Sequence, residues 1–71
     1  MSRHGLEALI LIAIDRRAGE WVTVEQIASR LGVARDRVLA VCADLAAQAQ
    51  VQHARFDGHE AYGIHIGGVD P

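Results

Sequence analysis

The stretch "IASRLGV", residues 27–33, has the features of a short helix that ends in a sharp turn. Upstream, Thr23 followed by Gln26 forms a capping box: the Thr hydroxyl accepts from the Gln26 amide while the Gln side chain reaches back to the chain. Gly32 supplies the positive φ that a sharp turn requires, so we expect the helix to end there. One helical face carries Val24, Ile27, Ala28 and Leu31. The preceding Trp21, Val22 and Thr23 predict a short strand.

The next stretch, "ARDRVLAVCADLAAQAQ", predicts a second helix from about Ala34 to Gln50. Its expected core side holds Val38, Val41, Cys42, Leu45 and Ala49. Its opposite side, which we call the outer face, holds Asp36, Ala40, Ala43, Asp44 and Ala47. Leu39 and Gln50 flank that face. Ala34 stands where a capping Ser or Thr is common, so this helix is expected to begin without a side-chain cap.

Residues 51–66, "VQHARFDGHEAYGIHI", predict a β-hairpin that turns at Asp57-Gly58. Asp-Gly suits a two-residue type I′ turn, in which both central φ angles are positive. This register opposes Phe56 to His59, Arg55 to Glu60, His53 to Tyr62 and Val51 to Ile64. Val51, Tyr62 and Ile64 would then share the core face.

Residues 3–17 predict an N-terminal helix, with Ser2 as its cap and Gly19 as its end. One stripe of it carries Leu6, Leu9, Ile10, Ala13 and Ile14. Leu11 and Ile12 fall outside that stripe, and a helix that is apolar on two sides usually has two partners. The helix could be fully buried in a larger core, but a chain of 71 residues is too small to cover it. We therefore expect Leu11 and Ile12 to form a homodimer interface.

This order of elements, with "IASRLGV" followed by later aliphatic core residues, resembles the winged helix-turn-helix family of small bacterial-type DNA-binding regulators. The residues that carry the resemblance are Ala28 at the helix crossing, Gly32 in the turn, and Val33, Val38 and Val41 behind it. The resemblance covers residues 3–66. It implies an α+β fold of three helices followed by a β-hairpin wing, as one domain over residues 1–66 with a flexible tail at 67–71.

The resemblance also implies that the outer face of the third helix enters the major groove of double-stranded DNA. The expected DNA-contacting residues are Arg35, Arg37, Arg55, Arg30 and His59. Arg55 can instead pair with Glu60 across the hairpin. Alanines offer bases only a methyl group and aspartates repel phosphates, so base discrimination should be shallow. The alternative, which stays open, is a winged helix reused for protein–protein interaction, with the alanine-rich face as the docking surface.

Composition sets further bounds on function. All seven basic residues are arginine, yet the net charge is −2, which argues against a strongly electrostatic DNA-binding protein. A lone thiol, Cys42, without a signal peptide favours a cytoplasmic protein. The longest apolar run, "ALILIAI", is far shorter than the roughly 20 residues that span a bilayer, so no membrane partner is expected.

Catalytic and metal chemistry are not expected. The four histidines match no zinc-ligand spacing, and Cys42 lies on the expected core side of a helix, where thiols are inert. The sequence has no Gly-rich phosphate loop and no paired-carboxylate cleft. We therefore expect no enzyme activity, no metal and no cofactor.

Overall fold

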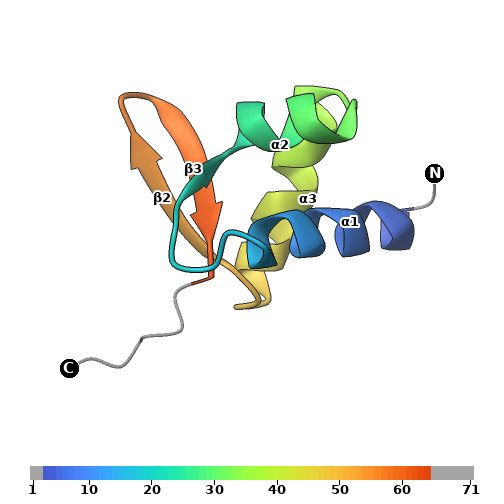
Figure 1. Cartoon of the computed structure of the whole chain (residues 1–71), viewed down its shortest axis with the longest axis horizontal. Coiled ribbons are helices and arrows are strands. Elements are labelled where there is room, and N and C mark those ends of the chain that lie inside the picture. Colours follow the sequence, from blue (N-terminus) through green and yellow to red (C-terminus); the bar gives the residue numbers. More distant parts are fainter. Residues whose placement is uncertain (1–2, 65–71) are drawn as a thin grey trace.

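A computed structural model describes residues 3–64, which form three helices and a small antiparallel sheet (Figure 1). In chain order the elements are α1 (Arg3–Asp15), β1 (Val22–Thr23), α2 (Val24–Leu31), α3 (Arg35–Ala47), β2 (Gln52–Phe56) and β3 (His59–Gly63). The sheet order is β1-β3-β2. The predicted α+β architecture of three helices plus a C-terminal hairpin is confirmed. Ser2, the end of the predicted hairpin and the predicted tail at 67–71 lie outside the described residues.

The junction between β1 and α2 forms as the sequence predicts. The Gln26 amide donates to Thr23 Oγ1 at 3.1 Å, and the Thr23 amide donates to Gln26 Oε1 at 3.0 Å. At the other end of α2, Gly32 has a φ of 67°, and its amide donates to the Ala28 carbonyl. At each end of this eight-residue helix, nearby residues therefore bond to backbone groups that have no partner within the helix.

The wing, which consists of β2, the turn and β3, has the predicted register. Phe56 opposes His59, Arg55 opposes Glu60, and His53 opposes Tyr62. The turn residues Asp57 and Gly58 have φ angles of 50° and 81°, as a type I′ turn requires. β3 also pairs with β1, so the wing is joined directly to the strand that leads into α2.

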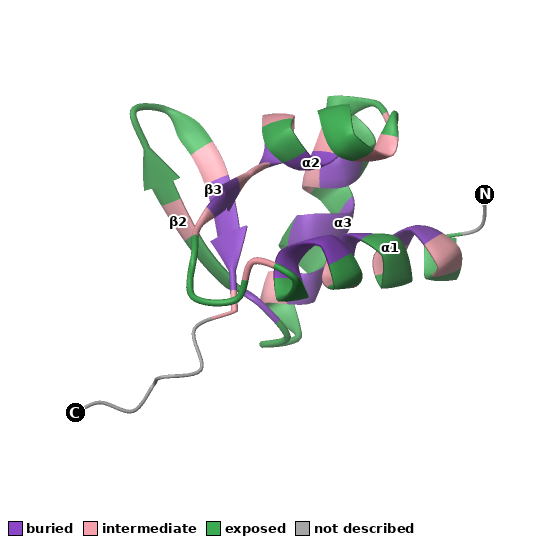
Figure 2. Cartoon of the chain, in the orientation of Figure 1, coloured by how far each residue is buried: buried purple, intermediate pink, exposed green. Residues whose placement is uncertain are grey.

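The core lies between the three helices and one face of the sheet (Figure 2). Its buried residues are Leu6, Ile10 and Ile14 from α1, Val22, Val24 and Ile27 around β1 and α2, Val38, Val41, Cys42 and Leu45 from α3, and Val51 and Tyr62 near and in the sheet. No polar or charged side chain is fully buried within residues 3–64. Burial raises the pKa of the Cys42 thiol to about 12, so it stays protonated at neutral pH. The chemistry of this chain therefore lies on its surface.

Two predicted core positions are wrong, one at the margin of the buried stripe of α1 and one beyond the end of α3. Leu9 is 39% exposed, because it lies at the margin of the buried stripe of α1, on the same side as Ile12. Ala49 is exposed, because α3 ends at Ala47 and not at Gln50. α1 likewise ends at Asp15, before the predicted end at residue 17.

The end of α3 is closed by a backbone motif that usually contains glycine. Ala49 has a φ of 60°, its amide donates to the Ala46 carbonyl at 3.0 Å, and the Gln50 amide donates to the Leu45 carbonyl at 2.9 Å. This pair of bonds is the Schellman pattern, in which the left-handed residue is most often glycine. The side chain of Ala49 is strained in this conformation, since a Cβ atom clashes with the following carbonyl oxygen there.

We predict that Ala49→Gly stabilises the protein by about 0.5–1 kcal/mol, because the relief of left-handed strain exceeds the extra chain entropy of glycine. Urea unfolding at equilibrium measures this. The control is Ala43→Gly, at an exposed position within α3, which should lose about 0.5–1 kcal/mol. A loss of stability at residue 49 as large as that at residue 43 would contradict the prediction.

Candidate nucleic-acid interface

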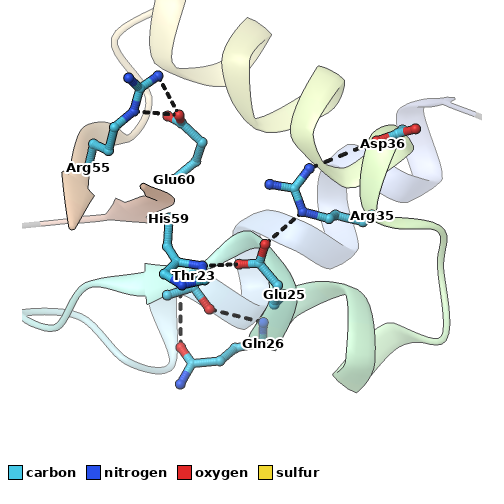
Figure 3. Close-up of polar contacts among 8 residues, drawn as sticks. All are labelled: Thr23, Glu25, Gln26, Arg35, Asp36, Arg55, His59 and Glu60. Atoms are coloured by element: carbon cyan, nitrogen blue, oxygen red, sulfur yellow. Dashed lines mark hydrogen bonds and ion pairs between the residues drawn. The ribbon is translucent and has the colours of Figure 1, made fainter. Parts of the chain in front are cut away.

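The start of α3 and the tip of the wing meet at the carboxylate of Glu25 (Figure 3). Arg35 is the first residue of α3, and its Nε donates to Glu25 Oε2 at 2.6 Å. His59 is the first residue of β3, and its Nδ1 lies 3.6 Å from Glu25 Oε1. Figure 1 shows the wing turn, α2 and the start of α3 along the same side of the molecule, at the top of the view. Two of the predicted DNA-contacting residues are therefore brought together, around an acidic residue of α2.

The two oxygens of Glu25 are satisfied unequally. Oε2 accepts from Arg35, whereas Oε1 is buried and has no hydrogen-bond partner among the described residues. The side chain as a whole is still 41% exposed. A buried carboxylate oxygen without a donor costs free energy, and the hydrogen bond from Arg35 is the main contact that holds this carboxylate.

A second acidic residue, Glu60, holds the cations of the wing. Arg55 contacts Glu60 Oε2 through its Nε at 2.8 Å and through a second nitrogen at 2.6 Å (Figure 3). His53 Nε2 contacts Glu60 Oε1, and the His53 ring also lies against Tyr62, with centroids 5.0 Å apart. The Glu60 side chain is only 15% exposed. The predicted pairing of Arg55 with Glu60 is therefore present in the structure.

Both acidic residues titrate below their ordinary range. The hydrogen bond from Arg35 is the main cause that lowers the pKa of Glu25, and it raises the pKa of Arg35 in return. The pKa of Glu60 is lowered first by the hydrogen bond with His53 and then by that with Arg55. Both carboxylates are therefore ionised at neutral pH, and each balances an arginine.

Arg30 and Arg37 complete the predicted set, and they differ from the other two arginines. Both are exposed and take part in no ion pair within residues 3–64. Arg37 follows Arg35 by two positions, and such residues do not share a helical face. The two arginines at the start of α3 therefore flank its outer face on opposite sides, with Arg35 on the side toward α2 and the wing.

The outer face of α3 is exposed as predicted, at Asp36, Ala40, Ala43, Asp44 and Ala47. One of its contacts was not predicted from the sequence. Asp44 pairs with Arg3 of α1, which moderates its negative charge toward a ligand. Ala34 provides no side-chain cap for α3, which agrees with the sequence, so the first amides of this helix have no side-chain acceptor from it.

The wing also exposes an aromatic residue that the sequence analysis did not single out. Phe56, beside the turn, is 48% exposed, and its ring stands edge-on to Trp21 at a centroid distance of 5.9 Å and an angle of 62°. Strand alternation puts Phe56 on the face opposite Tyr62, and that alternation could have identified it. The aromatic pair joins the wing tip to the segment that enters β1.

The predicted dimer residues lie on α1, whereas the site described above is formed by α2, α3 and the wing. Ile12 is 50% exposed, whereas Leu11 is half-buried and packs against the core. Together with Asp15, Gln50 and Ile64 they line a shallow, open hollow. Leu9 adds to the exposed apolar surface of the same helix.

Residues 3–64 contain neither a metal-binding cluster nor a membrane-spanning helix. No three His, Cys, Asp or Glu side chains in this range converge closely enough to hold a metal ion. None of the helices in this range has the length and apolar character needed to cross a bilayer. In comparisons with known proteins, no family model and no curated sequence matches this chain. The resemblance to the winged helix-turn-helix family therefore depends on the sequence pattern and on the observed order of elements.

We predict that carboxyl ¹³C NMR titration will give pKa values for Glu25 and Glu60 below the ordinary 4.5. Because the folded values are depressed, the stabilisation is present above pH 4.5 and is lost as the pH falls through the folded values. Arg35→Ala should return the pKa of Glu25 toward its ordinary value and change the pKa of Glu60 much less, because His53 and Arg55 hold Glu60. An unchanged Glu25 in that variant would show that Arg35 does not hold it in solution.

Proposed function

We propose that this protein is a small dimeric winged-helix DNA-binding protein that acts as a transcriptional regulator with shallow base discrimination. The observation that carries the proposal is the meeting of the α3 start and the wing tip at Glu25, which puts Arg35 and His59 on one face. A helix start and a wing on the same face can contact one duplex together, the helix in a groove and the wing on the adjacent backbone.

The outer face of α3 suits close approach rather than base recognition. Its alanines at 40, 43 and 47 leave no long side chain between the helix and the floor of a major groove, which is about 12 Å wide. Phosphate contacts fall to Arg35 and Arg37 on either flank of this face, with Arg30 and Arg55 as further cations. The partial positive charge at the start of α3 supports phosphate binding at the same place.

A second copy of the chain is part of the proposal. Four arginines provide a modest electrostatic contribution, and a dimer doubles them. The apolar surface of α1 at Leu11 and Ile12 is the proposed contact between the copies. We place the protein in the cytoplasm, where an unpaired Cys42 stays reduced.

The second candidate function is a protein-binding module. The observation that favours it is charge balance: Glu25 and Glu60 already pair with Arg35 and Arg55, while the outer face of α3 offers alanines and aspartates. Such a surface suits a protein partner better than a polyanion. If this candidate is right, Ala43→Arg should break a complex with a protein rather than strengthen binding to DNA.

We predict that Arg35→Ala with Arg37→Ala abolishes a mobility shift on random duplex DNA at 50 mM salt and leaves the fold intact, because neither side chain belongs to the core. Where residual binding can be titrated, the slope of log K against log salt should fall by roughly one unit per lost contact. The matched control removes two arginines elsewhere, at Arg16 and Arg17 in the turn after α1, and should keep the shift. Absence of any shift by the unaltered protein contradicts DNA binding and favours the second candidate.

We predict that Ile12→Glu converts the dimer to a monomer or destabilises the chain, because it puts a charge into the proposed contact. Sedimentation equilibrium measures the change. Ala18→Glu, in the exposed turn after α1, is the control and should leave the dimer intact. If the unaltered protein is monomeric at high micromolar concentration, this interface does not exist.

A further inference from the structure

We infer that Glu25 is an internal competitor for DNA: its carboxylate occupies a phosphate site built from Arg35 and His59, and binding exchanges the carboxylate for a backbone phosphate. The inference rests on the proposed DNA-binding function. It adds a site of defined chemistry, a phosphodiester oxygen held between helix α3 and the wing, and names the residue that limits access to it.

The geometry of the site is that of an anion-binding site that is already filled. Arg35 comes from α3 and His59 from β3, and both present nitrogen atoms to one carboxylate of α2, at 2.6 Å and 3.6 Å (Figure 3). A phosphate offers the same charge and more acceptor oxygens, so it can replace the carboxylate between these two donors. Arg35 is 44% exposed and His59 is 60% exposed, so a ligand can reach both from solvent.

The hold of Glu25 on the site is incomplete, which makes the exchange feasible. Oε1 is buried and has no hydrogen-bond partner among the described residues, so this carboxylate loses hydration without a full set of contacts. Glu60 differs: it contacts both Arg55 and His53 and is 15% exposed. Of the two arginines that pair with these carboxylates, Arg35 is therefore the one that DNA recruits more readily, because Glu60 holds Arg55 more tightly.

The test is a titration of random duplex DNA at several salt concentrations with the unaltered protein and with Glu25→Gln. Removal of the competing carboxylate should tighten binding by about three- to tenfold, the range for one exposed ion pair plus one repelling charge near phosphate. Glu20→Gln is the matched control, because it also removes one negative charge and releases one arginine, Arg17, in the turn after α1. It should change affinity less than about twofold, since screening weakens distant charges.

A double-mutant cycle with Arg35→Ala isolates the mechanism. If Glu25 acts by occupying Arg35, most of the gain from Glu25→Gln should disappear in the Arg35→Ala background. An equal gain in both backgrounds, or an equal gain from Glu20→Gln, would show a general effect of net charge and overturn the inference. Thermal melts of each variant establish that the fold is kept.

The outcomes separate the inference from the function on which it rests. If the unaltered protein binds DNA and Glu25→Gln binds no better, the inference fails and the proposed function stands. If neither protein binds at 50 mM salt, the proposed function fails as well. Should Glu25→Gln not fold, the Arg35 Nε–H resonance of the unaltered protein gives the same test: it should move when duplex is added, and a fixed resonance during binding overturns the inference.

Discussion

Thr23 is the residue on which the arrangement of the surface depends, because it ends β1 and caps α2 at once. Its backbone pairs with Ala61 of β3, and its side chain and amide close the capping box with Gln26. The strand that belongs to the sheet of the wing therefore passes without a loop into the helix-turn-helix. Glu25 follows two residues later, so its position between Arg35 and His59 results from this junction.

The patterns that predicted the fold are local ones. The capping box, the glycine that ends α2 and the Asp57-Gly58 turn each depend on residues within a few positions of one another, and all three formed as expected. The errors lie where the tertiary environment decides. Leu9 belongs to the apolar stripe by periodicity but lies at its edge. Ala49 has a left-handed backbone conformation, which conformational propensity does not predict for an alanine.

The candidate site was predictable by residue type but not by pairing. Cross-strand register predicted the contact of Arg55 with Glu60, because the turn fixes which residues oppose each other. The contacts of Glu25 with Arg35, ten residues on, and of Asp44 with Arg3 follow from how helices cross, which no short-range pattern encodes. These pairs lower the expected contribution of the arginines to DNA binding. An arginine that already pairs with a carboxylate adds less to the affinity for a polyanion than its formal charge suggests.

We propose that the α3 start and the wing tip form one DNA-facing surface. The most direct measurement is the change in backbone amide NMR shifts when a random-sequence duplex is added to the ¹⁵N-labelled protein. We expect changes concentrated at residues 34–38 and 55–59, with the amides of α1 unchanged. Changes confined to α1, or none at all under conditions where the protein stays folded, would contradict it.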